Sequence, residues 1–369
     1  METTHRVVAG DARSLSELDD DSVELVVTSP PYPMIEMWDD LFSGLDPAIG
    51  EHLEAGEGRA AFARMHEVLG SVWEEVGRVL VDGGIACVNV GDATRTVDGS
   101  FRVFQNHSKV VDAFETLGFE PLPEILWRKP VNSGAKFMGS GMVPPNAYAT
   151  LEHEYVLVFR NGKTSRSFEP GAERRYNAAY FWEERNRWFS DLWTDVRGEL
   201  QALGDDELRT RSAAYPFEIP YRLVNMYSVY GDTVLDPFWG TGTTSLAAMV
   251  AGRHSIGYEL ESEFLELFEE TVEDVPEYAR EVVGRRLDEH GAFVETRSAE
   301  GKEFQYRAER YGVPVVTKQE ERIRFHVASA VRETDDGYEV AYDPLEGTDL
   351  DVRGGPEGDA DAGTAPSDR

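Results

Sequence analysis

The sequence predicts a doubly wound α/β fold, in which a mostly parallel sheet carries helices on both of its faces. Three observations predict it. Strand-like and helix-like segments alternate over residues 5–159 and again over 213–265. A buried strand at 232–238 runs into a glycine-rich turn that opens a helix, and the strand after that helix ends in an acid, Glu259. In folds of this class, such turns and acids lie at one edge of the sheet and bind ligands there.

The elements of the first 159 residues follow from their apolar patterns. A strand, a turn, a short helix or loop, and a second strand fit residues 5–32. Apolar residues at helical spacing over 58–80 end at a Gly-Gly helix stop. Residues 110–130 predict a helix, a turn and a strand, and further apolar strands are predicted at 85–92 and 153–163.

Residues 160–215 break this alternation, because they are rich in arginine and aromatic residues without a clear period. Beyond residue 260 we expect a helix interrupted near Pro276 and a hairpin that turns at Asp335-Asp336-Gly337. An acidic, glycine-rich tail from Asp343 is predicted to be disordered. Between the arginine-rich segment and residue 260, the alternation resumes as helix, strand, helix and strand at 220–231, 232–238, 244–252 and 254–260.

The chain is strongly acidic. Its 69 Asp and Glu side chains face 36 basic ones, for a net charge of −33, and only six of the bases are lysines. This composition is typical of a protein from a very salty cytoplasm, and the alternative is an acidic protein that avoids nucleic acid. At molar salt the Debye length falls to about 3 Å, so repulsion would nearly vanish and the overall charge does not exclude a DNA partner.

Cysteine content and hydropathy exclude several classes. Cys87, the single cysteine, lies in a predicted buried strand, so an intrachain disulfide and a cysteine-based metal cluster are excluded. No apolar stretch approaches 18 residues, and the N-terminus lacks the apolar core of a signal peptide. We therefore expect a cytoplasmic protein with no membrane segment and no metal.

The stretch DPFWGTGTT, residues 236–244, is the strongest motif in the sequence. Gly240 and Gly242 allow the backbone to approach a ligand closely, and Glu259 is placed to accept hydrogen bonds from a ribose. A dinucleotide fingerprint would need a third glycine where the chain has Ser245, and no phosphate-binding Gly-Lys-Ser/Thr follows. A purely structural strand–helix turn is the alternative.

A second unusual stretch is SPPY, residues 29–32, here called the elbow. Pro30 and Pro31 fix their own backbone conformation and offer carbonyl acceptors but no N–H donors. They therefore form a stiff connection between Ser29 and Tyr32 at the end of a buried strand. Taken alone, the stretch fits a polyproline turn equally well.

Together these stretches resemble the amino-methylating DNA methyltransferases of the beta arrangement, in which the elbow precedes the glycine turn. DPFWGTGTT resembles the S-adenosylmethionine loop of that family, and VVAGDA at 7–12 resembles its adenine-contacting turn. AAYPFEIPYRLV at 213–224 resembles the helix before the loop, with Tyr-Pro replacing the usual Phe-Pro. The resemblance implies a Rossmann-like methyltransferase fold with circularly permuted motif order and S-adenosylmethionine as cofactor. The implied cofactor-binding residues are Asp11, Ala12, Tyr215, Pro216, Asp236, Phe238, Gly240, Thr241, Gly242 and Glu259.

The elbow fits the catalytic signature of that family, which is Asp, Asn or Ser, then Pro-Pro, then an aromatic residue. An exocyclic amino group is a poor nucleophile, because its lone pair is delocalised into the base. By the resemblance, the Ser29 hydroxyl and the Pro30 carbonyl accept its two N–H bonds and aim the lone pair at the methyl group, without a metal or a covalent intermediate. The base must be flipped out of double-stranded DNA, and Tyr32 next to Pro31 offers it a stacking face.

The first elbow residue bears on the choice of base. In the resembled family, serine there usually accompanies methylation of cytosine N4, whereas Asp or Asn accompanies adenine N6. We expect cytosine-N4 methylation, because the Ser29 hydroxyl can accept from N4 and donate to the ring. Methylation of cytosine C5 is disfavoured, because it needs a cysteine nucleophile beside a proline and the single cysteine, Cys87, lies between Ala86 and Val88. The alternatives are adenine-N6 methylation, methylation of RNA or of a protein amide, and a DNA-binding regulator that keeps a cofactor pocket.

The segment before the cofactor loop often reads the target in this family. Residues 160–187 hold seven basic and four acidic residues, a local charge of +3 in a chain of −33, with aromatic residues interleaved. This predicts a DNA-contacting insert, and a solvated basic face over a small aromatic core is the alternative. LWRKP at 126–130 resembles a strand end near the active site. The candidate DNA contacts are Arg128, Lys129, Arg174, Arg175, Trp182, Arg185 and Arg187.

The resemblance covers roughly residues 5–265. TSPPYPMIEMWDDLF at 28–42 is similar to solitary methylases of salt-loving archaea that modify short palindromes such as CTAG. The expected role is DNA modification, the reaction that restriction–modification systems also use. A homodimer and an accompanying endonuclease are left open. The predicted parts are a catalytic half at 1–159, a target-recognition insert at 160–212, a cofactor-binding half at 213–265, an extension at 266–342 and an acidic tail at 343–369.

Overall fold

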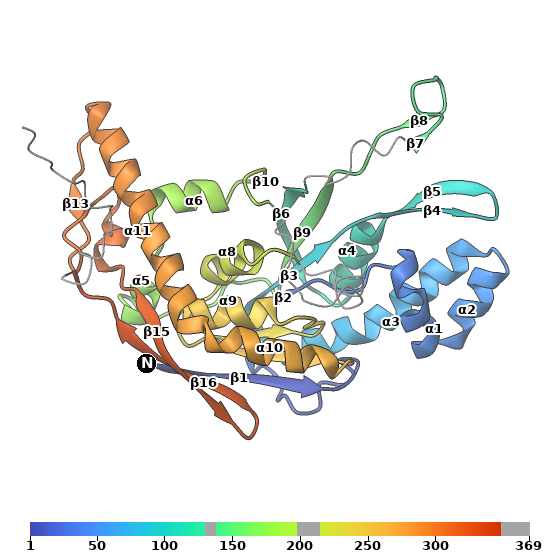
Figure 1. The fold of residues 1–369 in the computed structure, drawn as a ribbon, viewed down its shortest axis with the longest axis horizontal. Coiled ribbons are helices and arrows are strands. Elements are labelled where there is room, and N and C mark those ends of the chain that lie inside the picture. Colours follow the sequence, from blue (N-terminus) through green and yellow to red (C-terminus); the bar gives the residue numbers. More distant parts are fainter. Residues whose placement is uncertain (130–137, 198–214, 348–369) are drawn as a thin grey trace, which may run out of the picture.

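A single ten-stranded sheet organises the chain in the computed structural model, which describes residues 1–129, 138–197 and 215–347 (Figure 1). Of its ten strands, only β9 and β16 run against the others, so the sheet is mostly parallel, as predicted. The strand order is β10 (Leu192–Trp193), β6 (Glu120–Arg128), β9 (His153–Arg160), β3 (Leu80–Val90), β2 (Val23–Thr28), β11 (Thr233–Asp236), β12 (His254–Glu259), β1 (Glu2–Ala9), β16 (Gly337–Pro344) and β15 (His326–Thr334).

Two apolar layers cover the two faces of the sheet. Along β2, Leu25 and Val27 pack into one buried cluster and Val26 into the other, as the period of two in a strand requires. The first cluster includes helices α8 (Glu218–Tyr227), α9 (Thr243–Ala251) and α11 (Val275–Ala299), and the second includes α3 (Gly58–Val79) and α4 (Asn106–Thr116). Helices on both faces make this a doubly wound α/β fold, which confirms the predicted class.

The predicted helix at 58–80 shows how the sequence specifies packing. The buried residues of α3 include Ala61, Met65, Leu69, Val72 and Val76, which recur at intervals of three or four along one side of the helix. Its charged residues lie on the opposite side, in contact with solvent or with ion partners. The helix ends at Val79, directly before β3 begins at Leu80.

The C-terminal extension is part of the main body. Helix α10 (Glu263–Glu273) and α11 are separated at Asp274, which confirms the predicted interruption near Pro276. Strands β15 and β16 form the predicted hairpin, and β16 pairs with β1, so the hairpin extends the large sheet. The prediction of a disordered tail from Asp343 is wrong for Asp343 and Pro344, because both belong to β16; residues 348–369 lie outside the described part.

Two short hairpins project away from the sheet in Figure 1. They are β4 (Ala93–Val97) with β5 (Ser100–Phe104), and β7 (Met138–Gly139) with β8 (Ala147–Tyr148). Within the described ranges, no helix is both long and apolar enough to cross a membrane. The remaining elements are η1 (Glu36–Trp38), α1 (Asp39–Leu45), α2 (Pro47–Glu54), α5 (Glu173–Asn177), α6 (Trp182–Trp188), β13 (Tyr306–Arg307), β14 (Pro314–Val315) and η2 (Lys318–Arg322).

The sheet order brings the predicted motifs together. From β2 the chain moves outward to β3, and from β11 it moves outward in the other direction to β12, so the topology switches between β2 and β11. In open α/β sheets the crevice at such a switch point, beside the carboxyl ends of the strands, is where ligands bind. The elbow follows β2 at that edge, and the glycine turn follows β11.

Candidate active site

A cavity of about 540 Å³ lies at the carboxyl ends of β1, β2, β11 and β12. Its size is in the range of small-molecule sites, which are typically about 300–1,000 Å³. Of the residues predicted for catalysis and for the cofactor, only Pro216 and Gly242 are not among its lining residues. The predicted residues that line it are Asp11, Ala12, Ser29, Pro30, Pro31, Tyr32, Tyr215, Asp236, Phe238, Gly240, Thr241 and Glu259.

The glycine turn places its backbone against the cavity. Gly240 has a φ of +56°, and a Cβ added there would meet no atom nearer than the Phe238 carbonyl oxygen at 4.0 Å. Gly242 has a φ of +80° and caps the start of α9, and a Cβ there would come within 2.4 Å of the Phe268 ring. Gly240 therefore leaves the space beside the turn open to the cavity, and Gly242 allows the Phe268 ring to pack closely against the turn.

Asp236 ties the two motifs to each other. Its Oδ1 accepts a hydrogen bond from the Thr28 hydroxyl, which immediately precedes the elbow, at 2.6 Å. Its Oδ2 accepts from the Thr244 hydroxyl at 2.6 Å, and the Tyr215 hydroxyl lies 2.5 Å from Thr244 Oγ1. Burial raises the pKa of Asp236 to about 6. No role was predicted for Thr28, which immediately precedes the elbow, or for Thr244, which is the last residue of DPFWGTGTT.

Glu259 lies at the tip of β12, as predicted. Its Oε2 accepts from the backbone N–H of Gly240 at 2.8 Å and its Oε1 accepts from the N–H of Glu261 at 3.0 Å. Burial raises the pKa of its carboxyl group. The Glu259 carbonyl accepts from the N–H of Gly10 at 2.9 Å, which places the turn carrying Asp11 next to the same strand end.

The turn after β1 is held by its own ion pair. The Asp11 carboxylate accepts hydrogen bonds from Nε and Nη2 of Arg13, and the distance from Oδ2 to Nη2 is 2.6 Å. Partial burial works to raise the pKa of Asp11, but the hydrogen bonds from Arg13 outweigh it, so the pKa of Asp11 is lowered. Ala12, between them, is 6% exposed and lines the cavity. Asp11 and Ala12 therefore occupy a fixed turn at the cavity wall.

The elbow is fixed from behind by α4. The Asn106 side chain, fully buried at the start of α4, donates to the Pro33 carbonyl at 3.2 Å and to the Gly91 carbonyl at 2.9 Å. At the front, the Ser29 hydroxyl lies 3.1 Å from the Tyr32 hydroxyl, which donates to Glu154 Oε2 at 3.1 Å. Burial and the Glu154 carboxylate raise the pKa of Tyr32 well above its ordinary value, so the phenol stays protonated.

An apolar wall that the sequence analysis did not predict completes the cavity. It comes from the segment after the elbow and from α3, and its signals in the sequence were the apolar residues of PMIEMWDDLF at 33–42 and the helical apolar period over 58–80. A mostly apolar lining with a few polar groups is typical of sites that bind small molecules. Its members are Met37, Trp38, Leu41, Phe42, Leu45, Val68, Leu69 and Val72.

None of the predicted DNA contacts lines this cavity. Arg128 is exposed and lies 3.4 Å from a carboxylate oxygen of Glu152, whereas Lys129 donates to Glu154 at 2.8 Å. Arg174 pairs with the fully buried Asp232 carboxylate at 3.0 Å. The structure thus brings Lys129 next to the elbow network, while Arg128 and Arg174 lie apart from the cavity.

The remaining candidates lie on α5, which carries Arg175, and on α6, and they contact aromatic or acidic side chains of the same chain. Arg175 lies over the Phe168 ring at 5.4 Å and Arg185 over the Phe189 ring at 5.5 Å. Trp182 stacks on Phe293 of α11, with ring centroids 5.8 Å apart. The insert extends to residue 212 in the prediction, and its part from 198 onward lies outside the described residues.

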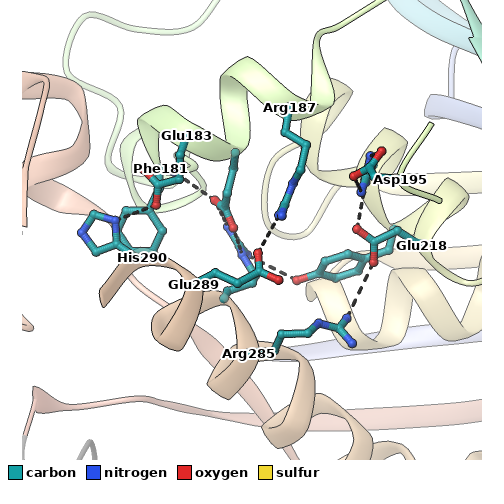
Figure 2. A network of polar contacts seen from close by, with 12 residues as sticks. Phe181, Glu183, Arg187, Asp195, Glu218, Arg285, Glu289 and His290 are labelled. Atoms are coloured by element: carbon teal, nitrogen blue, oxygen red, sulfur yellow. Dashed lines mark hydrogen bonds and ion pairs between the residues drawn. The ribbon is translucent and has the colours of Figure 1, made fainter. Parts of the chain in front are cut away.

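Helix α6 is fastened to α11 by ion pairs (Figure 2). Arg187 of α6 pairs with Glu289 at 2.8 Å, and Glu183 pairs with His290 at 2.7 Å. The buried Glu184 carboxylate accepts from Nε of Arg286 at 2.6 Å. These contacts make α6 a packed part of the main body.

The described residues contain no group of three or more His, Cys, Asp or Glu side chains that could hold a metal ion. Cys87 is fully buried in β3, and burial raises the pKa of its thiol above its ordinary value. A buried and protonated thiol is a poor nucleophile. The polar side chains that line the cavity include Ser29 and Tyr32 of the elbow, Asp236 and Glu259, together with Asp11, Arg13, Asp40, Thr241 and Glu261.

Comparison with known proteins agrees with this geometry. Residues 23–270 match the model of a DNA methylase family, the N6/N4 methyltransferases. The chain is 50% identical over 329 residues to the type II methyltransferase M.MthZI of Methanothermobacter thermautotrophicus, covering 88% of this chain and 91% of that protein. It is 51% identical over 281 residues to M.MjaI of Methanocaldococcus jannaschii, covering 73% of this chain and 91% of that protein.

Solved structures show the same fold. A putative DNA modification methylase from Thermus thermophilus, in complex with S-adenosyl-L-methionine, is 32% identical and superimposes with a TM-score of 0.56 over 73% of this chain and 93% of that one. The residues matched by the family model include the elbow, the glycine turn and the acid-ended strand, and the identity to the relatives extends over most of the chain. The chain belongs to the N6/N4 DNA methylase family.

Proposed function

We propose that the protein transfers a methyl group from S-adenosylmethionine to the N4 amino group of a cytosine within a short DNA sequence. The observation that carries this proposal is the position of Ser29. It is the first residue of the elbow, and it lines the same cavity as the glycine turn and Glu259. A hydroxyl at this position accepts a hydrogen bond from an amino group without introducing a charge.

The residues of the cavity fit the cofactor. The open space beside Gly240 lets a ligand approach the turn, and the Glu259 carboxylate is at the strand tip where a ribose is held in folds of this class. Asp11 and Ala12 would lie beside the adenine, with Asp236, Phe238 and Thr241 at the methionine end. S-adenosylmethionine supplies an electrophilic methyl group on a sulfonium.

The elbow then acts on the amino group. Ser29 Oγ and the Pro30 carbonyl oxygen accept its two N–H bonds, which favours a pyramidal nitrogen whose lone pair points toward the methyl group. The stiffness of Pro30-Pro31 and the Asn106 contact to Pro33 keep these acceptors in place before the base arrives. The Tyr32 ring offers the flipped base a stacking face, which is worth about 1–3 kcal/mol for a base on an aromatic side chain.

The test is to identify the modified nucleoside. Unmethylated genomic DNA is incubated with the protein and S-adenosylmethionine at high and at low salt, digested to nucleosides and analysed by mass spectrometry. We expect N4-methylcytosine, and a duplex containing CTAG is the first defined substrate to try. N6-methyladenine would contradict the choice of base and leave the elbow mechanism standing. Absence of any methylated nucleoside at both salt concentrations would contradict the proposed function.

A further inference from the structure

A polar cluster lies behind the elbow, outside the residues that line the cavity. Glu154, near the start of β9, is 8% exposed, and Asn89, near the end of β3, is 1% exposed. Glu154 Oε1 accepts from the Lys129 ammonium at 2.8 Å. Its Oε2 accepts from Asn89 Nδ2 at 2.8 Å and from the Tyr32 hydroxyl at 3.1 Å. A charged, buried side chain therefore contacts the aromatic residue of the elbow directly.

The chemistry of these groups sets the direction of each hydrogen bond. A carboxylate only accepts, so the single phenol proton of Tyr32 is directed to Glu154. Asn89 Nδ2 donates to the Tyr32 oxygen at 2.9 Å as well as to Glu154. Because the phenol proton is already engaged, the Tyr32 oxygen meets the Ser29 hydroxyl, 3.1 Å away, as an acceptor.

The directions of the hydrogen bonds among Asn89, Glu154 and Tyr32 are not easily reversed. If the Asn89 amide were turned over, its carbonyl oxygen would face the Glu154 carboxylate, and two acceptors would repel. In the observed orientation, Asn89 Oδ1 is buried and has no hydrogen-bond partner within the described part of the chain, which indicates that the two donated bonds determine the orientation. Gly91 leaves just enough room, since a Cβ there would lie 3.0 Å from the Tyr32 ring and 3.3 Å from Glu154 Cγ.

We propose that Glu154, held by Lys129 and Asn89, is a positioning residue that directs the Ser29 hydroxyl proton toward Tyr32, so that Ser29 Oγ faces the cavity with its lone pairs. The inference rests on the proposed function, in which Ser29 accepts from the amino group being methylated. It refines that function in one respect. With its proton on Tyr32, Ser29 meets the base as an acceptor alone and does not also donate to the ring.

Two substitutions and their combination test this chain of hydrogen bonds. Glu154→Gln keeps the size of the side chain but adds an N–H donor, which can reverse the direction of the bond to Tyr32. Tyr32→Phe keeps the stacking ring and removes the oxygen to which Ser29 donates. Each is expected to lower kcat by about tenfold to a hundredfold, the loss typical of a displaced catalytic group, with unchanged KM for S-adenosylmethionine. The matched control is Glu152→Gln, which makes the same change at an exposed acid two residues before Glu154 in the sequence and should keep wild-type kcat.

The double variant Glu154→Gln/Tyr32→Phe is the decisive measurement. If Glu154 acts through Tyr32, it should lose no more activity than the more damaging single variant, because the second change breaks a chain that is already broken. Multiplying losses would overturn the proposal, as would wild-type kcat in Glu154→Gln. Thermal unfolding and S-adenosylmethionine affinity are recorded for each variant. If Glu154→Gln does not fold, Tyr32→Phe alone tests the proposal, and wild-type kcat in Tyr32→Phe would also overturn the proposal. Normal turnover by Ser29→Ala would instead contradict the proposed function.

Discussion

The cavity at the switch point and the contact between α6 and α11 are both rich in polar side chains, but the partners of those side chains differ between the two regions. In the cavity, residues of the elbow and of the glycine turn line open space, and Asp236 and Glu259 are held in place by hydroxyl and backbone donors. Between α6 and α11, charged side chains of opposite sign satisfy one another inside the protein (Figure 2). Groups positioned by neighbours and left facing a cavity are available for chemistry, whereas mutually paired charges contribute to the packing of the body.

The largest expected effect is at the glycine turn. Gly240→Val should abolish measurable S-adenosylmethionine binding, because its side chain would enter the open space beside the turn. The fold should survive with reduced stability, since a non-glycine residue at a φ of +56° is strained by about 1–3 kcal/mol. Isothermal titration calorimetry and circular dichroism measure the two properties. Wild-type cofactor affinity in this variant would show that the cavity is not the cofactor site.

A substitution in the α6–α11 contact should have the opposite profile. Glu184→Gln leaves the buried Arg286 guanidinium without its carboxylate partner, and breaking one side of a buried ion pair costs about 3–5 kcal/mol of unfolding free energy. Denaturant unfolding should show that loss, while cofactor affinity of the folded protein stays at the wild-type level. A reduced cofactor affinity without loss of stability would contradict the distinction between the two regions.

The His290–Glu183 pair predicts a pH dependence of stability. Burial works to lower the pKa of His290, but the hydrogen bond to Glu183 and its charge outweigh it, so the pKa is raised. Because the folded-state pKa lies above the unfolded value of about 6.5, the stabilisation is fully present below that pH and is lost as the pH rises through the folded pKa. Thermal unfolding between pH 6 and 9 should show this decrease, and His290→Gln should remove it. An equal decrease in the variant would assign it to other groups.

The smallest expected effect sharpens the question of DNA binding by α6. Arg187 and Glu289 are both partly exposed, so Arg187→Ala should cost at most about 1 kcal/mol of stability. If Arg187 also contacts a phosphate, as the sequence predicts, DNA affinity should fall uniformly across sequences and the salt dependence should weaken by about one counterion. Fluorescence anisotropy at several salt concentrations measures both. Unchanged affinity and salt dependence would leave Arg187 as a contact to α11 alone.

The parts of the fold that the sequence predicts are those specified locally. The period of α3, the break near Pro276 and the turn of the β15–β16 hairpin each depend on neighbouring residues, and each is confirmed. The pairing of β16 with β1 was not predictable, because it joins residues such as Thr3 and Val340 from opposite ends of the chain. Residues that pair across long separations carry no local signal.

The same distinction holds for the site. The elbow and the glycine turn are contiguous motifs, and their residues meet in one cavity. Glu154 received no role from the sequence, because its contact with Tyr32 spans 122 positions and comes from the antiparallel pairing of β9 with β3. The DNA role of the insert rested on composition, which counts arginines without showing which of them have internal partners. That role remains a prediction.

The most direct test of the account is the single-turnover rate of methyl transfer by Ser29→Ala, measured alongside its affinity for S-adenosylmethionine. Removing one preorganised hydrogen-bonding group from an active site typically costs about 10²–10³ in rate. We predict a loss of at least that size with wild-type cofactor affinity, because in the proposed function Ser29 acts on the amino group and other residues of the cavity hold the cofactor. A rate close to wild type would contradict the central claim that the elbow hydroxyl accepts from the base.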